Sequence, residues 1–185
     1  MIPNNAQPMP WRKYSDTLNE SMNYIENRAN GSIKSLKTNW QQFNSIGLNG
    51  VEWGNSYILS SRPGVGKSLL IASLTRQMQE LNKNQDFYIL HFQFEMAGKN
   101  LAAREISSAN NLNLRYLLSA KDKGMPDLID SKIIKIKDYV SKQKDRKEYI
   151  IDTPMTVKEM KATLFAFYSF VKKPFIVTLD HTMLV

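Results

Sequence analysis

The chain contains no cysteine, so it has neither a disulfide framework nor a thiolate zinc site. It also has no apolar run long enough to cross a membrane, since the longest strongly apolar segment, 164–171, is short and includes Tyr168 and Ser169. The first ten residues lack a basic region followed by an apolar core, so no secretory signal is expected. These absences argue against secreted and membrane-spanning classes and predict a soluble protein of a reducing cytoplasm.

The composition that remains is that of a folded, basic protein. With 185 residues, 42% of them hydrophobic, the chain is able to bury one sizeable core, and we expect a single domain with appendages. The net charge of +8 and the pI near 9.6 favour a polyanionic partner, although basic composition by itself indicates nucleic acid only weakly.

The most informative stretch is 57–74, which reads as a strand, a glycine loop and the start of a helix. Residues 57–59 form a short apolar run typical of a buried parallel strand, and 62–66 interrupt it with a proline and two glycines. The helix that follows has one apolar stripe for packing on a sheet, formed by Leu70, Leu74, Met78 and Leu81. Strand, loop and helix in this order predict a phosphate-binding loop.

Such a loop holds phosphates because its backbone N–H groups turn inward and the helix N-terminus adds partial positive charge. Lys67 is expected to reach the β- and γ-phosphates of ATP, and the Ser68 hydroxyl to bind Mg²⁺. Ser61 stands where the usual pattern has its first glycine, and the alternative is a chance loop that caps an ordinary helix. The predicted nucleotide-binding residues are Ser61, Arg62, Pro63, Gly64, Val65, Gly66, Lys67, Ser68 and Leu69.

Two acidic residues follow predicted strands. Glu95 comes directly after the aromatic-rich run 87–94, at the end of the strand where open α/β sheets bind ligands. There it is placed to orient or deprotonate the water that attacks the γ-phosphate. Its position is equally compatible with capping a helix that starts near Ala97, so both roles stay open at this point.

Asp180 ends the second of these strands, 175–180. A buried strand that presents a carboxylate at its tip is the form of the second nucleoside-triphosphatase motif, in which the aspartate holds Mg²⁺ together with Ser68. The alternative is an aspartate that merely begins a turn. The phosphate loop upstream favours the metal role.

The remaining chain predicts mostly helices. Residues 1–14 are expected to be a disordered lead-in, and 15–31 a helix with a narrow apolar stripe, a capping box of Thr17 and Glu20, and a stop at Gly31. That stripe favours docking on a neighbouring subunit and packing on its own domain about equally. Residues 32–185 form the predicted main domain, in which 32–55 is a connecting region.

Within the main domain, helices are expected over 99–108, 113–118 and 129–140 and from about Thr156, with a third strand over 149–152. The helix from Thr156 is expected to turn Met160, Leu164, Phe167 and Val171 inward. The helix over 129–140 has a lysine-rich face, which we interpret as solvated rather than as a surface that follows phosphates.

With these pieces in order, the chain resembles the ATPase domain of DnaB-type replicative helicases. The resemblance covers about 15–185 and rests on the loop 61–68, on Phe94-Glu95-Met96 with Leu101 and Arg104 following, on 151–154, and on 176–180. It implies an α/β fold, namely a RecA-like P-loop NTPase whose mostly parallel sheet is flanked by helices.

The resemblance also implies a mechanism. Glu95 matches the family's catalytic glutamate, which acts with Lys67 on ATP and Mg²⁺, and the family moves on single-stranded DNA as a ring of subunits. The helix over 15–31 matches the linker helix that packs on the adjacent subunit of a homo-hexamer. We therefore expect a DNA helicase of a bacterial cell or, because His181 follows Asp180 as in phage members, of a phage-infected host.

The chain departs from the family pattern at its ends. The family carries a γ-phosphate sensor, DNA-contacting loops and an arginine finger beyond the position of Val185, so we expect this chain to be the amino-proximal part of the ATPase domain, incomplete at its C-terminus. Two other functions stay open: a RecA-like nucleotide switch that assembles on DNA without unwinding it, and a non-enzymatic nucleotide-binding remnant. A P-loop small-molecule kinase is disfavoured by the lack of an arginine-rich lid segment.

Overall fold

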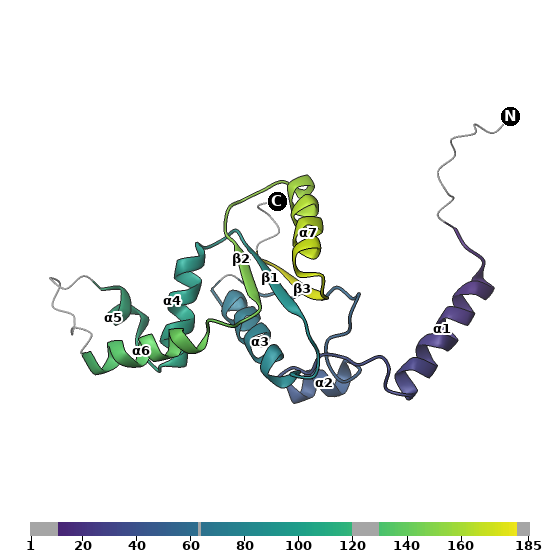
Figure 1. The fold of residues 1–185 in the computed structure, drawn as a ribbon, viewed down its shortest axis with the longest axis horizontal. Helices are drawn as coiled ribbons and strands as arrows, with labels where there is room; N and C mark the ends of the chain where they lie inside the picture. Colours follow the sequence, from purple (N-terminus) through teal and green to yellow (C-terminus); the bar gives the residue numbers. More distant parts are fainter. Residues whose placement is uncertain (1–10, 63, 120–129, 181–185) are drawn as a thin grey trace. The chain divides into compact units, whose positions relative to one another are not determined.

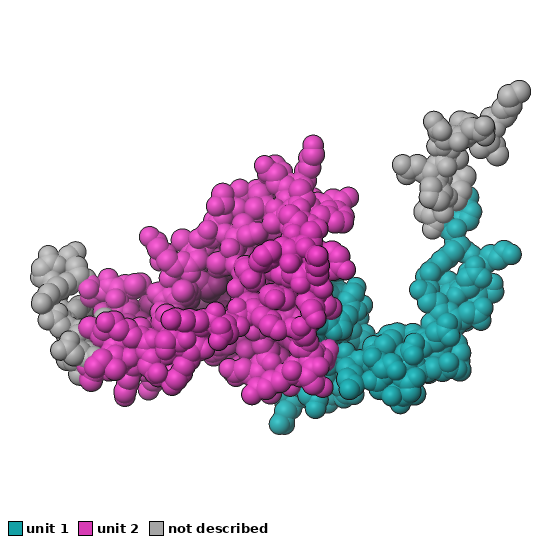
Figure 2. Space-filling view, in the orientation of Figure 1, with its two compact units in different colours: residues 1–56 teal, residues 57–185 magenta. Residues whose placement is uncertain are grey.

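A computed structural model of the protein describes residues 11–62, 64–119 and 130–180 (Figure 1). Most of the predicted lead-in, Pro63, the turn around 122–127 and His181 lie outside these ranges. The chain divides into two compact units, residues 1–56 and residues 57–185 (Figure 2). No helix in the described ranges is both long enough and apolar enough to cross a membrane.

The first unit contains α1 (Tyr14–Ala29) and a short helix α2 (Gln41–Ile46), which was not predicted. Arg28, near the end of α1, donates to the Leu48 carbonyl at 2.8 Å and pairs with Glu52 at 3.0 Å, so the helix end is tied to the loop before residue 52. A single antiparallel bridge joins Leu36 to Val51.

The predicted helix over 15–31 is confirmed, but its capping box is wrong. The helix begins at Tyr14, after the N-cap Lys13, so Thr17 lies inside the first turns rather than at the cap. Glu20 is paired instead with Arg12 at 2.6 Å. The apolar stripe of α1 is more than half exposed at Leu18, Met22 and Ile25.

The second unit is built around a three-stranded parallel sheet. Its elements are, in chain order, α3 (Lys67–Leu81), β1 (Tyr88–Gln93), α4 (Gly98–Ala109), α5 (Leu114–Leu118), α6 (Asp130–Lys142), β2 (Glu148–Ile151), α7 (Val157–Val171) and β3 (Phe175–Asp180). The strand order is β2-β1-β3, and both pairings are parallel, as the sequence predicted. Because β1 is the central strand, its neighbours hold it along both edges.

The core lies between the sheet and α7. Leu90, Phe92 and Phe94 point to one face of β1 and pack against side chains of β2, β3 and α7. The predicted inward residues Met160, Leu164 and Phe167 belong to this cluster. Figure 1 shows α3 on the other side of the sheet from α7, so helices cover both faces. Helices on both faces are the usual cover of a mostly parallel sheet, whose two faces are both buried.

Helix α7 begins where its sequence signals a start. The hydroxyl of Thr156 accepts from the Glu159 N–H, and the Glu159 carboxylate accepts from the Thr156 N–H at 2.7 Å, a reciprocal capping box. The Thr156 hydroxyl also donates to the Glu159 carboxylate at 2.8 Å, and the hydrogen bonds from the Thr156 backbone N–H and then from its hydroxyl lower the pKa of the Glu159 carboxyl. The box fixes the point at which the chain leaves β2 and enters the helix that covers the core.

The predicted strand over 57–59 is wrong. No strand is assigned there, and Ile58 is 94% exposed. An apolar run becomes a strand only when a neighbouring strand accepts its backbone hydrogen bonds, and the described strands pair only as β2-β1-β3. Leu81 was also predicted to face inward, yet it is 48% exposed at the last residue of α3.

Candidate nucleotide-binding site

The glycine loop ends directly on α3, as predicted. Gly66 is the N-cap of the helix and has φ +101°, and Gly64 has φ +79°. Residues that carry a side chain rarely adopt these positive φ values, so glycine is the residue that fits. A Cβ added at either position would meet nothing within 4 Å, which leaves open space beside the backbone for a ligand to approach.

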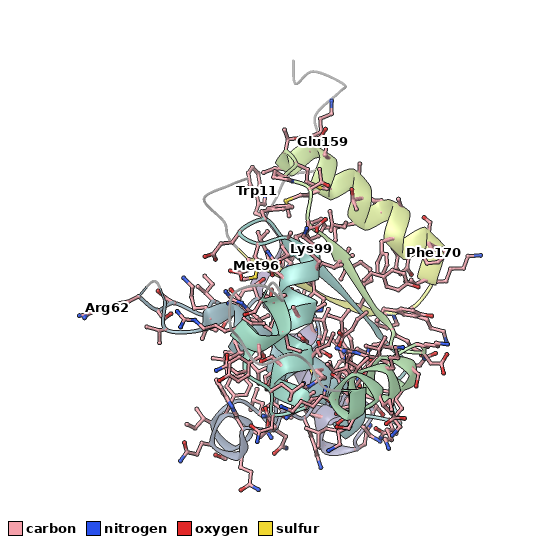
Figure 3. All side chains as sticks on the ribbon, turned by 90° about the vertical axis from the view of Figure 1, so that its left-hand side faces the viewer. Trp11, Arg62, Met96, Lys99, Glu159 and Phe170 are labelled. Atoms are coloured by element: carbon pink, nitrogen blue, oxygen red, sulfur yellow. The ribbon has the colours of Figure 1, made fainter. Side chains whose placement is uncertain are left out.

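Lys67 and Ser68 are the first two residues of α3, and both are half-buried. They stand at the positive end of the helix dipole, where an anion is stabilised. Arg62 and Val65 are exposed on the loop, and Figure 3 shows Arg62 projecting away from the body of the unit. Ser61 uses its hydroxyl within the loop, donating to the Arg62 carbonyl at 3.2 Å.

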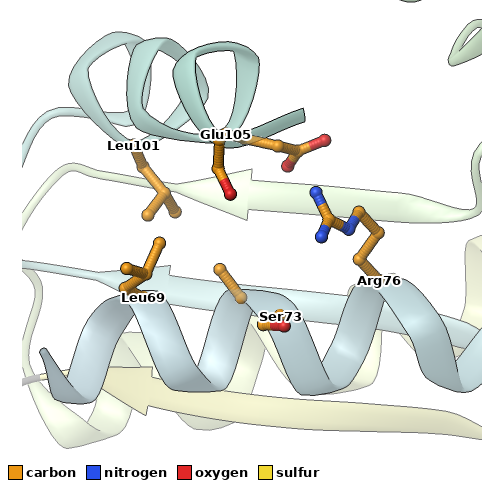
Figure 4. Close-up of a pocket in the computed structure, with 7 residues that line it drawn as sticks. Leu69, Ser73, Arg76, Leu101 and Glu105 are labelled. Atoms are coloured by element: carbon orange, nitrogen blue, oxygen red, sulfur yellow. The ribbon is translucent and has the colours of Figure 1, made fainter. Parts of the chain in front are cut away.

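The side chain of Leu69 faces α4, opposite Leu101 (Figure 4). It lines a small open pocket between α3 and α4, shown in Figure 4, whose lining residues are Leu69, Ala72, Ser73, Arg76, Leu101, Glu105 and Ser108. A phosphate contact from Leu69 would therefore come from its backbone N–H.

Glu95 and Asp180 lie at the same edge of the sheet. Asp180 is the last residue of β3 and pairs in register with Gln93, the last residue of β1, and Glu95 follows two residues later. The Phe94 N–H donates to the Asp180 carbonyl at 2.8 Å, which continues the pairing up to the residue before Glu95. In Figure 4 the strand arrowheads point towards the end of α3 that carries Leu69, so the start of α3 lies at this edge too.

The two acids differ in burial. Asp180 is 5% exposed, whereas Glu95 is exposed at the sheet edge. The Asp180 Oδ2 accepts a hydrogen bond from the amide Nε2 of Gln93 at 3.2 Å. A buried carboxylate needs such a partner, because an unpaired charge in the interior is costly. Sequence reasoning missed Gln93, because the pairing depends on a strand register between residues 87 positions apart.

The proposed Mg²⁺ ligands fit that ion's chemistry. Ser68 and Asp180 both offer oxygen, the donor that Mg²⁺ prefers. Within the described part of the chain no group of three or more histidines or carboxylates gathers to hold a metal. A nucleotide-dependent Mg²⁺ site takes one or two protein oxygens and completes its shell with phosphates and water.

A second group of polar side chains extends from the sheet to α6. His91 Nδ1 and Thr178 Oγ1 are 2.7 Å apart, on the same face of β1 as Gln93. Arg146 pairs with both Glu105 and Glu148, and the Tyr139 hydroxyl donates to Glu105 at 2.6 Å. Burial, followed by the hydrogen bond to Glu105, raises the pKa of Tyr139. This network joins α4, α6 and β2.

The sequence is similar to those of known proteins. The sequence model of the family described as DnaB-like helicase C terminal domain matches residues 16–185. The chain is also 30% identical over 114 residues to the replicative DNA helicase DnaB of Helicobacter pylori strain J99, an alignment that covers 60% of this chain and 22% of that protein. The chain therefore spans only about a fifth of the length of this relative.

Proposed function

Because the chain belongs to the DnaB-like helicase C-terminal domain family, a family of RecA-like P-loop domains, we propose that it is part of the motor of a replicative DNA helicase. In this proposal ATP hydrolysis drives movement along single-stranded DNA. The observation that carries it is the common edge of the sheet: the glycine loop at the start of α3, Glu95 after β1 and Asp180 at the end of β3.

Each residue at this edge has a role in the proposed reaction. The backbone of 61–69 and the Lys67 ammonium hold the phosphates, and they place the γ-phosphate at the positive end of α3. Ser68 and Asp180 would hold Mg²⁺, which neutralises phosphate charge when bound. Glu95 orients the attacking water and accepts its proton. Its exposure at the sheet edge leaves it accessible to that water.

The proposed partners follow from the same family membership. The H. pylori relative is named a replicative DNA helicase, and the net charge of +8 suits a polyanionic partner. Assembly into a homo-hexamer through α1 is supported by the exposed side chains of Leu18, Met22 and Ile25 on that helix. The cytoplasm of a bacterial cell or of a phage-infected host is the compartment that this function requires.

The test is ATP hydrolysis by the full-length protein with and without single-stranded DNA. We expect stimulation by DNA, and a loss of about 10²- to 10³-fold in Lys67→Ala because a phosphate contact is removed. Lys83→Ala, at an exposed lysine after α3, is the matched control. Hydrolysis that ignores DNA would contradict the proposal.

Two further measurements separate the alternatives. A nucleotide switch would assemble on DNA with ATP yet leave a forked duplex unopened, and a non-enzymatic remnant would bind ATP without turnover even with DNA present.

For the assembly, Ile25→Asp on α1 is expected to dissociate the hexamer in analytical ultracentrifugation, because it places a charge in an apolar contact. An unchanged hexamer would contradict the role of α1.

A further inference from the structure

Asp152 connects two elements that are far apart in the sequence. It follows the last residue of β2, and its Oδ2 accepts a hydrogen bond at 2.7 Å from the backbone N–H of Gly98, 54 residues earlier. Gly98 is the first residue of α4, and the N-cap residue Ala97 makes no side-chain capping bond. The first N–H groups of a helix need acceptors. Asp152 therefore supplies the cap that the local sequence lacks.

The packing at this point is as close as glycine permits. A Cβ at Gly98 would lie 3.1 Å from Ile150 Cδ1 and 3.2 Å from Asp152 Oδ2. Both distances are tighter than ordinary van der Waals contact, so β2 and the start of α4 approach each other through the missing side chain. The close approach of Ile150 is separate from the hydrogen bond to Asp152, and it fixes the same junction.

Glu95 lies on the short segment that ends at this junction. At its beginning, the Phe94 N–H is bonded to the Asp180 carbonyl of β3 at 2.8 Å. At its end, the Gly98 N–H is bonded to Asp152 beside β2. The segment is thus fixed to both neighbours of β1, and Glu95 stands between the two anchors.

We propose that Asp152 is a positioning residue for Glu95. It does not contact the nucleotide, and it acts by fixing the beginning of α4, and with it the segment that presents the glutamate to the attacking water. This inference rests on the proposed function. A catalytic group displaced by about 1 Å loses on the order of 10²-fold in rate, so the anchor is expected to affect turnover more than binding.

The experiment compares variants of the full-length protein in DNA-stimulated ATP hydrolysis. We expect Asp152→Ala to lower kcat by about 10- to 100-fold and to leave KM for ATP within about twofold, because the glycine loop is untouched. Asp152→Asn keeps an acceptor oxygen and is expected to restore most of kcat. Asp145→Ala, at an exposed aspartate, is the matched control.

If Asp152→Ala does not fold, Gly98→Ala and hydrogen exchange probe the same junction. Gly98→Ala improves helix propensity, so a lower kcat in this variant would arise from the close approach of β2. Hydrogen exchange at the Gly98 amide is expected to accelerate in Asp152→Ala and not in Asp152→Asn. An active wild type whose Asp152→Ala variant keeps its kcat would overturn this inference alone. A wild type without hydrolysis would overturn the proposed function and this inference with it.

Discussion

The two faces of β1 differ in what they contact. Leu90, Phe92 and Phe94 point into the cluster beneath α7, where the contacts are apolar. On the opposite face, His91 meets Thr178 and Gln93 meets Asp180, so polar side chains pair across to β3. The residues from 90 to 94 belong to β1 and its extension, and they alternate between the two faces because successive side chains of a strand point to opposite sides. One face holds the fold together, and the other carries hydrogen bonds towards the candidate site.

A short strand thus serves two purposes. The apolar face stabilises the fold by removing apolar area from water. A polar atom buried there without a partner would cost free energy. The polar face gains little net stability from each hydrogen bond, but it fixes the direction of the groups it pairs. We therefore expect substitutions on the first face to change the free energy of unfolding, and substitutions on the second to change activity.

The largest effect is expected from Phe92→Ala on the apolar face. Phe92 is fully buried, and removing its ring leaves a cavity, so the free energy of unfolding should fall by about 3–5 kcal/mol. Chemical denaturation measures this change. Phe165→Ala is the matched control, because that ring on α7 is 66% exposed and its loss should cost less than about 1 kcal/mol. Equal losses in the two variants would remove the distinction between core and surface.

The next effect is expected from Gln93→Leu on the polar face. The substitution keeps the side chain's approximate size and removes the hydrogen bond to Asp180 Oδ2. The partners that orient metal ligands typically contribute about 10- to 100-fold in metal affinity or activity. Titration of ATP hydrolysis with Mg²⁺ should show this loss. Gln79→Leu on α3 serves as the control. A Gln93→Leu variant with normal Mg²⁺ dependence would contradict the role given to the polar face.

The smallest effect is expected at the opposite edge of the sheet, where the strands begin. Asp86 lies just before β1 and accepts a hydrogen bond from Lys147, the residue before β2. Its Oδ2 is 3.0 Å from the Nζ of Lys173, which lies just before β3. The hydrogen bonds from Lys147 and then Lys173 lower the pKa of the Asp86 carboxyl.

The sign of the pH dependence follows from that direction. A carboxyl whose pKa is lower in the folded state stabilises the fold above its unfolded pKa, and this contribution is lost as the pH falls through the folded pKa. Asp86→Asn should therefore be slightly less stable than the wild type near neutral pH, and the difference should begin to shrink near pH 4 and vanish only below the lowered pKa of the folded state. Thermal denaturation over this range checks it. A difference that persists in acid would show that Asp86 acts by another route.

How much of this was predictable depended on how local each signal was. The strands β1, β2 and β3 were predictable because each is an apolar run between polar turns, and α3 because its apolar stripe follows a glycine loop. The capping box at Thr17 failed because the helix starts three residues earlier, at Tyr14. The short helix α2 has no apolar periodicity, and its flanking loop is fixed by a hydrogen bond from the Asn44 amide to the Thr38 carbonyl at 2.7 Å.

The partners of the candidate site residues were not predictable in the same way. The glycine loop, Lys67, Ser68, Glu95 and Asp180 were identified from motif and position in the sequence. Gln93 and Asp152 were not assigned roles, because their contacts join residues 87 and 54 positions apart. Such contacts depend on which strands are neighbours and in which register. The strand expected at 57–59 failed for the same reason, since pairing is a property of two segments.

The most direct test of the account is the behaviour of Glu95→Gln in the full-length protein. The variant keeps the size of the side chain and removes the base, so we predict an ATP affinity within about twofold of the wild type and a DNA-stimulated turnover lower by about 10²- to 10⁴-fold. Glu80→Gln, at an exposed glutamate on α3, should hydrolyse normally. Wild-type turnover in Glu95→Gln, measured beside an inactive Lys67→Ala, would contradict the assignment of Glu95 as the catalytic base.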